Sequence, residues 1–170
     1  MPKLTDELAA ILAANNVSTV FGLQGGAVAH IFDSLERNGI TVVYTAHEAA
    51  ASFAAAAQAK SSNGIGCCVV TTGPGTTNAL TGLLGAWQDS VPCIYISGQV
   101  RSEHMSYNKP VRQVGTQEAA IVNIVKPITK YAKVIEKANE IERVLIEALK
   151  IAISGRPGPV WIDIPLELQW

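Results

Sequence analysis

Three short segments of the chain combine glycines with polar or ionisable side chains, a composition typical of loops that hold ligands. They are Leu23-Gln24-Gly25-Gly26-Ala27, Ala46-His47-Glu48 and Thr72-Gly73-Pro74-Gly75-Thr76-Thr77-Asn78. Glycine allows a backbone to approach a ligand closely or to adopt a positive φ, and a carboxyl group such as that of Glu48 can transfer a proton during catalysis. The chemistry that these residues offer is therefore backbone contact with a ligand combined with proton transfer.

Each segment also has a simpler explanation when it is taken alone. Gly25-Gly26 is compatible with an ordinary turn, and Gly73-Pro74-Gly75 with a stiff turn or with a loop that presents amides to a phosphate. Glu48 fits a carboxylate in the first turn of a helix, where it stabilises the helix by up to ~1 kcal/mol, and His47 fits a polar contact at the same helix start. The chain has neither the dinucleotide-binding glycine fingerprint nor a Walker-type Gly-Lys-Ser/Thr sequence, so phosphate binding is a weak hypothesis.

The hydrophobic pattern predicts the elements that must position these loops. Strands are expected at residues 19–21, 40–45, 65–71, 93–97, 129–134 and 160–164, and helices at 4–15, 27–37, 48–60, 77–87, 117–125 and 138–153. The nearly continuous apolar run 65–71 is typical of a strand covered on both faces. This alternation predicts one α/β domain over residues 1–170, with an open, mostly parallel sheet and helices on both faces. The three loops are then expected to gather at one edge of the sheet, where such folds bind ligands.

Composition limits the classes of function. The 170 residues are 48% hydrophobic and 16% charged, with 13 basic and 14 acidic side chains and a formal net charge of −1, so neither nucleic acid nor a membrane surface is an expected partner. No apolar run reaches the ~18 residues of a membrane span, and the N-terminal sequence lacks the order of a signal peptide. Cys67, Cys68 and Cys93 lack metal-ligand spacing and are expected to be free buried thiols in the cytoplasm.

Several motifs in collinear order carry a resemblance to a known family over nearly the whole chain. They are Val20-Phe21-Gly22-Leu23-Gln24-Gly25-Gly26-Ala27, His47-Glu48, Thr72-Gly73-Pro74-Gly75-Thr76-Thr77-Asn78, Asp89-Ser90-Val91-Pro92, Ser97-Gly98-Gln99-Val100, Lys126-Pro127-Ile128-Thr129-Lys130, Gly155-Arg156-Pro157-Gly158-Pro159-Val160 and Ile162-Asp163-Ile164-Pro165. With these residues the chain resembles the N-terminal domain of the acetolactate synthase branch of thiamine-diphosphate (ThDP) enzymes. The resemblance implies the pyrimidine-binding type of the ThDP-binding fold, with ThDP as cofactor and a 2-keto acid as substrate.

The resemblance also implies roles for individual residues. Glu48 stands where the family has a glutamate whose carboxyl group hydrogen-bonds a ring nitrogen of the cofactor's aminopyrimidine. In the family, proton transfer through this hydrogen bond leads to deprotonation of the thiazolium carbon. The cofactor itself supplies the carbanion chemistry. Two loops match the family's contacts to the cofactor: Gly25, Gly26 and Ala27 for the reacting carbons, and Pro74 and Asn78 for the pyrimidine ring.

Gln117 matches a glutamine that lines the family's substrate channel, but the sequence around it departs from the family. Acetolactate synthases usually have a phenylalanine just before this glutamine, whereas this chain has Val114-Gly115-Thr116-Gln117-Glu118. The preceding Asn108-Lys109-Pro110-Val111-Arg112-Gln113 differs as well. These departures favour a broader expectation, the decarboxylation of some 2-keto acid with or without carboligation. Gln99 is expected near the site, with a structural hydrogen bond as its main role.

The same resemblance implies that the site is incomplete in this chain. In the family, the diphosphate and its Mg²⁺ rest on a second domain, usually of another subunit, through a Gly-Asp-Gly motif and a downstream asparagine. The sequence contains no Gly-Asp-Gly, and Asp33, Asp89 and Asp163 do not stand in such a setting, so no metal ligand is expected here. The chain is expected to be inactive alone and to need a homo-oligomer, a diphosphate-binding partner or both. A non-catalytic dimerising or regulatory protein stays open as the alternative, and an unrelated nucleotide-binding protein is disfavoured.

Overall fold

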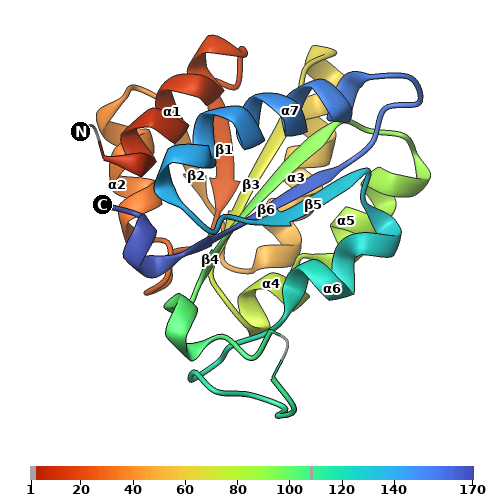
Figure 1. Ribbon diagram of the computed structural model, residues 1–170. Coiled ribbons are helices and arrows are strands. Elements are labelled where there is room, and N and C mark those ends of the chain that lie inside the picture. Colours follow the sequence, from red (N-terminus) through yellow and green to blue (C-terminus); the bar gives the residue numbers. More distant parts are fainter. Residues whose placement is uncertain (1–2, 108) are drawn as a thin grey trace.

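Strands and helices alternate along the computed structural model, which describes residues 3–107 and 109–170 (Figure 1). The strands are β1 (Thr19–Gly22), β2 (Thr41–Tyr44), β3 (Gly66–Val70), β4 (Cys93–Gln99), β5 (Tyr131–Val134) and β6 (Val160–Pro165). The helices are α1 (Leu4–Ala14), α2 (Ala29–Arg37), α3 (Glu48–Ser62), α4 (Pro74–Asn78), α5 (Leu80–Gln88), α6 (Ile121–Val125) and α7 (Ile141–Ile153). Short 3₁₀ turns are η1 (Ser102–His104), η2 (Lys126–Ile128), η3 (Ala138–Glu140) and η4 (Leu166–Leu168).

The strands form one sheet in the order β2-β1-β3-β4-β6-β5, and every neighbouring pair is parallel. β3, β4 and β6 are buried along their whole length, whereas the edge strand β5 is half-buried and the edge strand β2 is mostly exposed. Continuous apolar runs therefore mark the strands that helices cover on both faces. The predicted α/β class, with its open parallel sheet, is confirmed.

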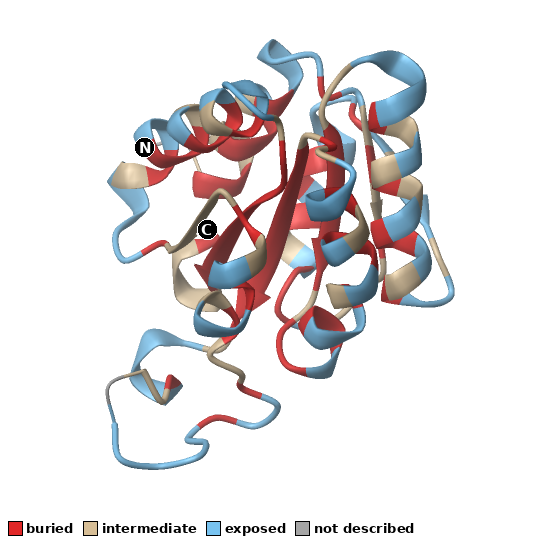
Figure 2. Cartoon of the chain, turned by 90° about the vertical axis from the view of Figure 1, so that its right-hand side faces the viewer, coloured by how far each residue is buried: buried red, intermediate tan, exposed pale blue. Residues whose placement is uncertain are grey.

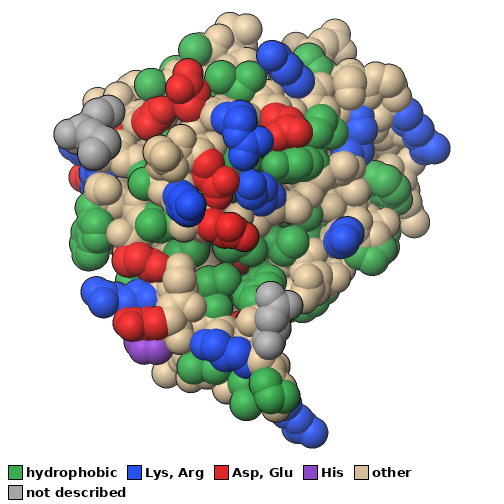
Figure 3. All heavy atoms as spheres, in the orientation of Figure 1, with side chains coloured by type: hydrophobic (Ala, Val, Ile, Leu, Met, Phe, Trp, Pro, Cys, Tyr) green, Lys and Arg blue, Asp and Glu red, His purple; other side chains and the backbone are tan. Residues whose placement is uncertain are grey.

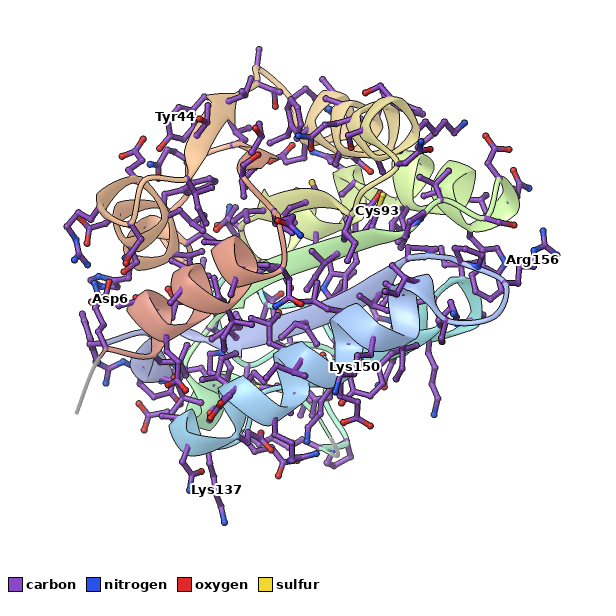
Figure 4. All side chains as sticks on the ribbon, turned by 90° about the horizontal axis from the view of Figure 1, so that it is seen from above. Asp6, Tyr44, Cys93, Lys137, Lys150 and Arg156 are labelled. Carbon is purple, nitrogen blue, oxygen red and sulfur yellow. The ribbon has the colours of Figure 1, made fainter. Side chains whose placement is uncertain are left out.

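Each face of the sheet has its own apolar core because side chains alternate along a strand. In β3, Cys67 and Val69 pack under α1, α2 and α7, whereas Cys68 and Val70 pack under α3, α5 and α6. Seen from above, α1 and α7 lie on one side of the sheet and α3 and α5 on the other (Figure 4). On the second face the rings of Tyr95 and Trp161 stack with centroids 5.2 Å apart. The three cysteines are free and buried, as predicted.

Two predicted helices differ from the structure. The helix expected at 77–87 is divided at Ala79 into α4 and α5, and it begins earlier, because Pro74 occupies the first helical position that proline favours. The helix expected at 117–125 is wrong in its first part, since α6 begins only at Ile121. Gln117 there has a φ of 60°, in the left-handed region, which a right-handed helix cannot include.

Residues 100–107 and 109–120 follow the carboxyl end of β4 and project from the body of the domain (Figure 1). Most of the described residues of this segment are exposed (Figure 2), and basic side chains lie on the projection (Figure 3). Asn108, part of the stretch that departs from the family, lies outside the described residues. Over residues 3–107 and 109–170, none of the helices has the length and apolarity that crossing a membrane requires.

Candidate cofactor-binding site

The three candidate loops follow β1, β2 and β3, which are neighbours in the sheet. Because β1 lies between the other two strands, the chain runs from β1 to one side and then returns past it to reach β3. Open parallel sheets bind their ligands outside the carboxyl ends of the strands at such a switch point. Hydrogen bonds join the loop after β1 and Glu48 to residues that follow β3, so the loops gather at one edge as predicted.

Glu48 is the first residue of α3, and only 7% of it is exposed. The preceding His47 caps the helix, because its Nδ1 accepts a hydrogen bond from the Ala49 N–H at 3.1 Å. The helix dipole stabilises a carboxylate at this position, so local structure accounts for part of the residue's placement. Asn78 adds a contact from a different loop, since its Nδ2 donates to Glu48 Oε2 at 2.9 Å. Burial and this long-range bond go beyond what a helix-end charge requires.

Thr71, at the carboxyl end of β3, joins the two glycine loops. Its Oγ1 accepts a hydrogen bond from the Ala27 N–H at 3.3 Å, and a Cβ on Gly25 would lie only 2.5–2.6 Å from its side-chain atoms. On its other side, a Cβ on Gly75 would lie 2.8 Å from Thr71 Cγ2 and 3.4 Å from Glu48 Oε1. Glycine at both positions therefore permits close packing around Thr71 and keeps open the space beside Oε1. Sequence reasoning missed Thr71, because only long-range contacts distinguish it from the end of an apolar strand.

Gly26 and Pro74 lie on the exposed side of these loops. A Cβ on Gly26 would meet open space, and neither Gly25 nor Gly26 has a positive φ, so backbone conformation does not account for this glycine pair. Pro74 begins α4 and is exposed, and Asn78 ends the same short helix. Both ends of α4 therefore lie near Glu48, with Asn78 in contact and Pro74 facing outward.

Gln117 lies against the second glycine loop through its backbone. A Cβ on Gly73, which has a φ of 65°, would collide with the Gln117 carbonyl oxygen. The left-handed conformation of Gln117 itself costs roughly 1–2 kcal/mol for a residue other than glycine, so its surroundings must hold it. Its side chain is exposed, and no hydrogen bond within the described part of the chain joins it to Glu48. The structure thus brings Gln117 beside the loop of Pro74 without a hydrogen bond to the carboxylate.

Gln99, at the end of β4, is fully buried and connects four segments behind these loops. Its Oε1 accepts hydrogen bonds from Thr72 Oγ1 at 2.8 Å and from the Val100 N–H at 2.9 Å. Its Nε2 donates to Asp163 Oδ2 and to the Ala119 carbonyl oxygen, each at 2.9 Å. The structural hydrogen bonding expected of Gln99 is confirmed.

Asp163, in β6, completes this buried network. Ser97 Oγ donates to its Oδ1 at 2.5 Å, and Trp161 Nε1 donates to the same serine oxygen at 2.8 Å. Burial raises the pKa of Asp163 to about 7, although the hydrogen bonds from Ser97 and Gln99 act to lower this pKa. Sequence reasoning assigned Asp163 no role, and no local signal would have done so.

The comparisons with known proteins agree with this geometry. A family model described as "Thiamine pyrophosphate enzyme, N-terminal TPP binding domain" matches residues 2–124. The chain belongs to this family. Thiamine pyrophosphate is the same molecule as ThDP, so the predicted resemblance is confirmed, and membership of the thiamine pyrophosphate enzyme family implies this cofactor.

The relatives of this thiamine pyrophosphate enzyme domain include acetolactate synthases of bacteria and plants. It is 42% identical over 155 residues to the acetolactate synthase large subunit of Haemophilus influenzae, covering 91% of this chain and 26% of the relative. The domain is 37% identical over 158 residues to the acetolactate synthase isozyme 2 large subunit of Escherichia coli, and the match covers 93% of this chain and 28% of the relative. The domain is 40% identical over 171 residues to the chloroplastic acetolactate synthase of Arabidopsis thaliana, and the match covers 98% of this chain and 24% of the relative.

The chain thus spans about a quarter of the length of the curated relatives that it matches. Because one of these relatives is described as chloroplastic, the cytoplasmic location stays a prediction. Among the side chains that the structure describes, no group of three or more His, Cys, Asp or Glu residues is arranged to hold a metal ion.

Proposed function

We propose that this chain is the pyrimidine-binding half of a ThDP-dependent 2-keto acid decarboxylase or carboligase, in which Glu48 activates the cofactor. One observation carries the proposal: a buried carboxylate at the switch point of the sheet has one oxygen held by Asn78 and the other beside a glycine. A second domain or subunit would hold the diphosphate and Mg²⁺. The acetolactate synthase names of the relatives support this class of reaction.

The residues present fit an aminopyrimidine. A ring nitrogen needs one carboxyl oxygen at hydrogen-bonding distance, and Gly75 leaves room next to Oε1 of Glu48 because it has no Cβ. The reacting carbons of the cofactor would need a close backbone approach, which Gly26 permits on its open side. The sequence has no Gly-Asp-Gly motif, by which the family holds the diphosphate. The fit therefore supports the pyrimidine half of the site alone.

When bound, the cofactor supplies a thiazolium that stabilises a carbanion. Oε1 of Glu48 would be the atom that holds or releases the proton shared with the pyrimidine nitrogen. Asn78 donates to Oε2 and so fixes the plane of the carboxyl group. Burial of Glu48 limits competing hydrogen bonds from water. A general acid–base contribution of this kind amounts to about 10²–10⁴-fold in rate.

The test combines this chain with a second polypeptide that carries a Gly-Asp-Gly motif and a downstream asparagine, together with ThDP and Mg²⁺. Consumption of 2-keto acids is measured for the wild type, Glu48→Gln and the matched control Glu142→Gln. Glu142 is also a first-turn carboxylate, on α7 and exposed. We expect Glu48→Gln to lose about 10²–10⁴-fold in rate and Glu142→Gln to stay within about twofold. Equal rates for the wild type and Glu48→Gln in an active mixture would refute the mechanism.

The alternative function, a non-catalytic dimerising or regulatory protein, makes a different prediction. A protein of this kind would self-associate and would bind no ThDP in any mixture. Because the proposed enzyme is also expected to associate, calorimetric titration with ThDP, and not size measurement, separates the two functions. A neighbouring reading frame that encodes Gly-Asp-Gly would favour the proposed enzyme.

A further inference from the structure

Two segments of the candidate site come from distant parts of the sequence and touch each other. The loop that contains Gly73 and leads to Asn78 follows β3, whereas Gln117 belongs to the projection after β4. Their backbones meet where Gly73 lies against the Gln117 carbonyl group. Because neither segment belongs to the sheet, other residues must fix how they lie relative to each other.

We propose that Gln99 is a positioning residue that locks these two segments together, with Asp163 orienting its amide. One side of the amide holds the first segment, because Thr72, directly before Gly73, is buried and donates to Oε1. The other side holds the second segment, because Nε2 donates to the carbonyl oxygen of Ala119, two residues after Gln117. The inference rests on the proposed function, since positioning matters only if these segments form the site.

The orientation of the Gln99 amide is determined by its partners. Asp163 Oδ2 accepts from Nε2, and the Val100 N–H donates to Oε1, so a flipped amide would face an acceptor with its oxygen and a donor with its nitrogen. With two bonds accepted and two donated, the buried amide has a partner for each of its usual bonding positions. A buried amide satisfied in this way rigidifies its surroundings, and the loss of one partner would leave a buried polar group without a hydrogen bond.

The second segment has an anchor of its own at Glu118, the residue directly after Gln117. The buried carboxylate of Glu118 accepts hydrogen bonds from Ser106 Oγ at 2.7 Å and from the Ser106 N–H at 3.0 Å. It also accepts one from the Val114 N–H at 3.3 Å. Glu118 therefore ties the projection to itself, whereas Gln99 ties it to the sheet. The strained backbone of Gln117 lies beside Glu118 and only two residues from the bond made by Gln99.

Hydrogen–deuterium exchange on the chain without cofactor tests the inference, with Gln99→Met compared to Gln169→Met. Gln169 is a matched control: it is also fully buried, and its Nε2 donates to the carbonyl oxygens of Ala27 and Ile164, outside both segments. The informative amides are those of Thr76 and Glu118, which donate to the carbonyl oxygens of Gly73 and Gly115. We expect Gln99→Met to accelerate exchange at both amides at least tenfold more than Gln169→Met, with equal effects on amides of β1.

A purely structural role would raise exchange equally across the domain in both variants, and that result would overturn the inference. If Gln99→Met does not fold, Thr72→Val removes only the bond to Oε1. It is then expected to accelerate exchange at Thr76 more than at Glu118, and equal rates in Thr72→Val and the wild type would overturn the inference. An inactive mixture with the partner polypeptide refutes the proposed function alone, because exchange is measured without cofactor or partner.

Discussion

Replacing Asp163 by asparagine is expected to remove a loss of stability that the wild type undergoes as pH rises from about 4 to 8. Asp163 is completely buried, and burial raises its pKa from the usual 3.8 to about 7. This difference of roughly three pH units corresponds to about 4 kcal/mol, at 1.36 kcal/mol per unit. Asparagine imitates the protonated acid, because its oxygen can accept from Gln99 while its NH₂ group donates to Ser97 Oγ.

The sign follows from proton binding. The folded protein keeps the Asp163 proton to a higher pH than the unfolded chain does, so the folded state binds more protons in this window and its stability falls as pH rises. This loss of stability is absent below about pH 4 and complete above about pH 7–8. Glu118 contributes to it, because its negative charge also raises the pKa of Asp163. Tyr107 stays neutral over the whole window, since burial raises its pKa further above the usual value.

Urea unfolding at five pH values between 4 and 8 measures the effect as the difference in unfolding free energy between the wild type and Asp163→Asn. Carboxylates whose pKa is lowered by hydrogen bonds, such as Asp6 with Ser34, titrate in both proteins and cancel in this difference. The wild type is expected to lose about 4 kcal/mol relative to the variant across the range. A difference that stays constant to within ~0.5 kcal/mol, about the limit for such measurements, would show that Asp163 does not titrate in this window.

The remaining predictions concern packing and thiol reactivity. Gly25→Ala is expected to destabilise the domain by about 1–3 kcal/mol, because the new Cβ collides with Thr71, whereas Gly26→Ala enters open space and changes stability by less than ~0.5 kcal/mol; equal effects in urea unfolding would contradict the packing around Thr71. Burial raises the pKa of Cys93 to about 12 and also raises the pKa of the other two thiols. A thiol reagent at pH 8 should therefore label the cysteines only after unfolding, and rapid labelling of the folded protein would be inconsistent with their burial.

Much of the fold is predictable because strands that helices cover on both faces need continuous apolar runs, which can be recognised in the sequence. The run that ends at Val70 is an example, since helices cover both of its faces. Helix boundaries were less accessible where the backbone departs from its local preference. Nothing in the sequence around Gln117 predicts a left-handed residue, and its carbonyl group lies against Gly73, which is 44 residues away along the chain.

The candidate site was also only partly predictable from the sequence. The resemblance named Glu48 and Asn78, and the structure joins them by a hydrogen bond although 30 residues separate them. Their roles toward a cofactor stay predictions. Thr71 and Asp163 could not be found from local pattern, because their partners lie 44 to 66 residues away along the chain. Side chains that organise a site through long-range contacts leave no periodicity or spacing to detect.

The place of β6 in the sheet has a consequence for how the protein matures on the ribosome. β6 follows every other strand in the chain, yet it lies between β4 and β5. The residues that bring Glu48 and Asn78 together all leave the ribosome before β6 does, whereas the bond from Gln99 to Asp163 waits until β6 inserts. Until then the edge of β4 is unpaired and open to wrong partners. The bond that orients Gln99 between the two segments that meet at Gly73 can therefore form only after β6 has inserted, and a nascent chain stalled before residue 163 would carry the carboxylate without a rigid site around it.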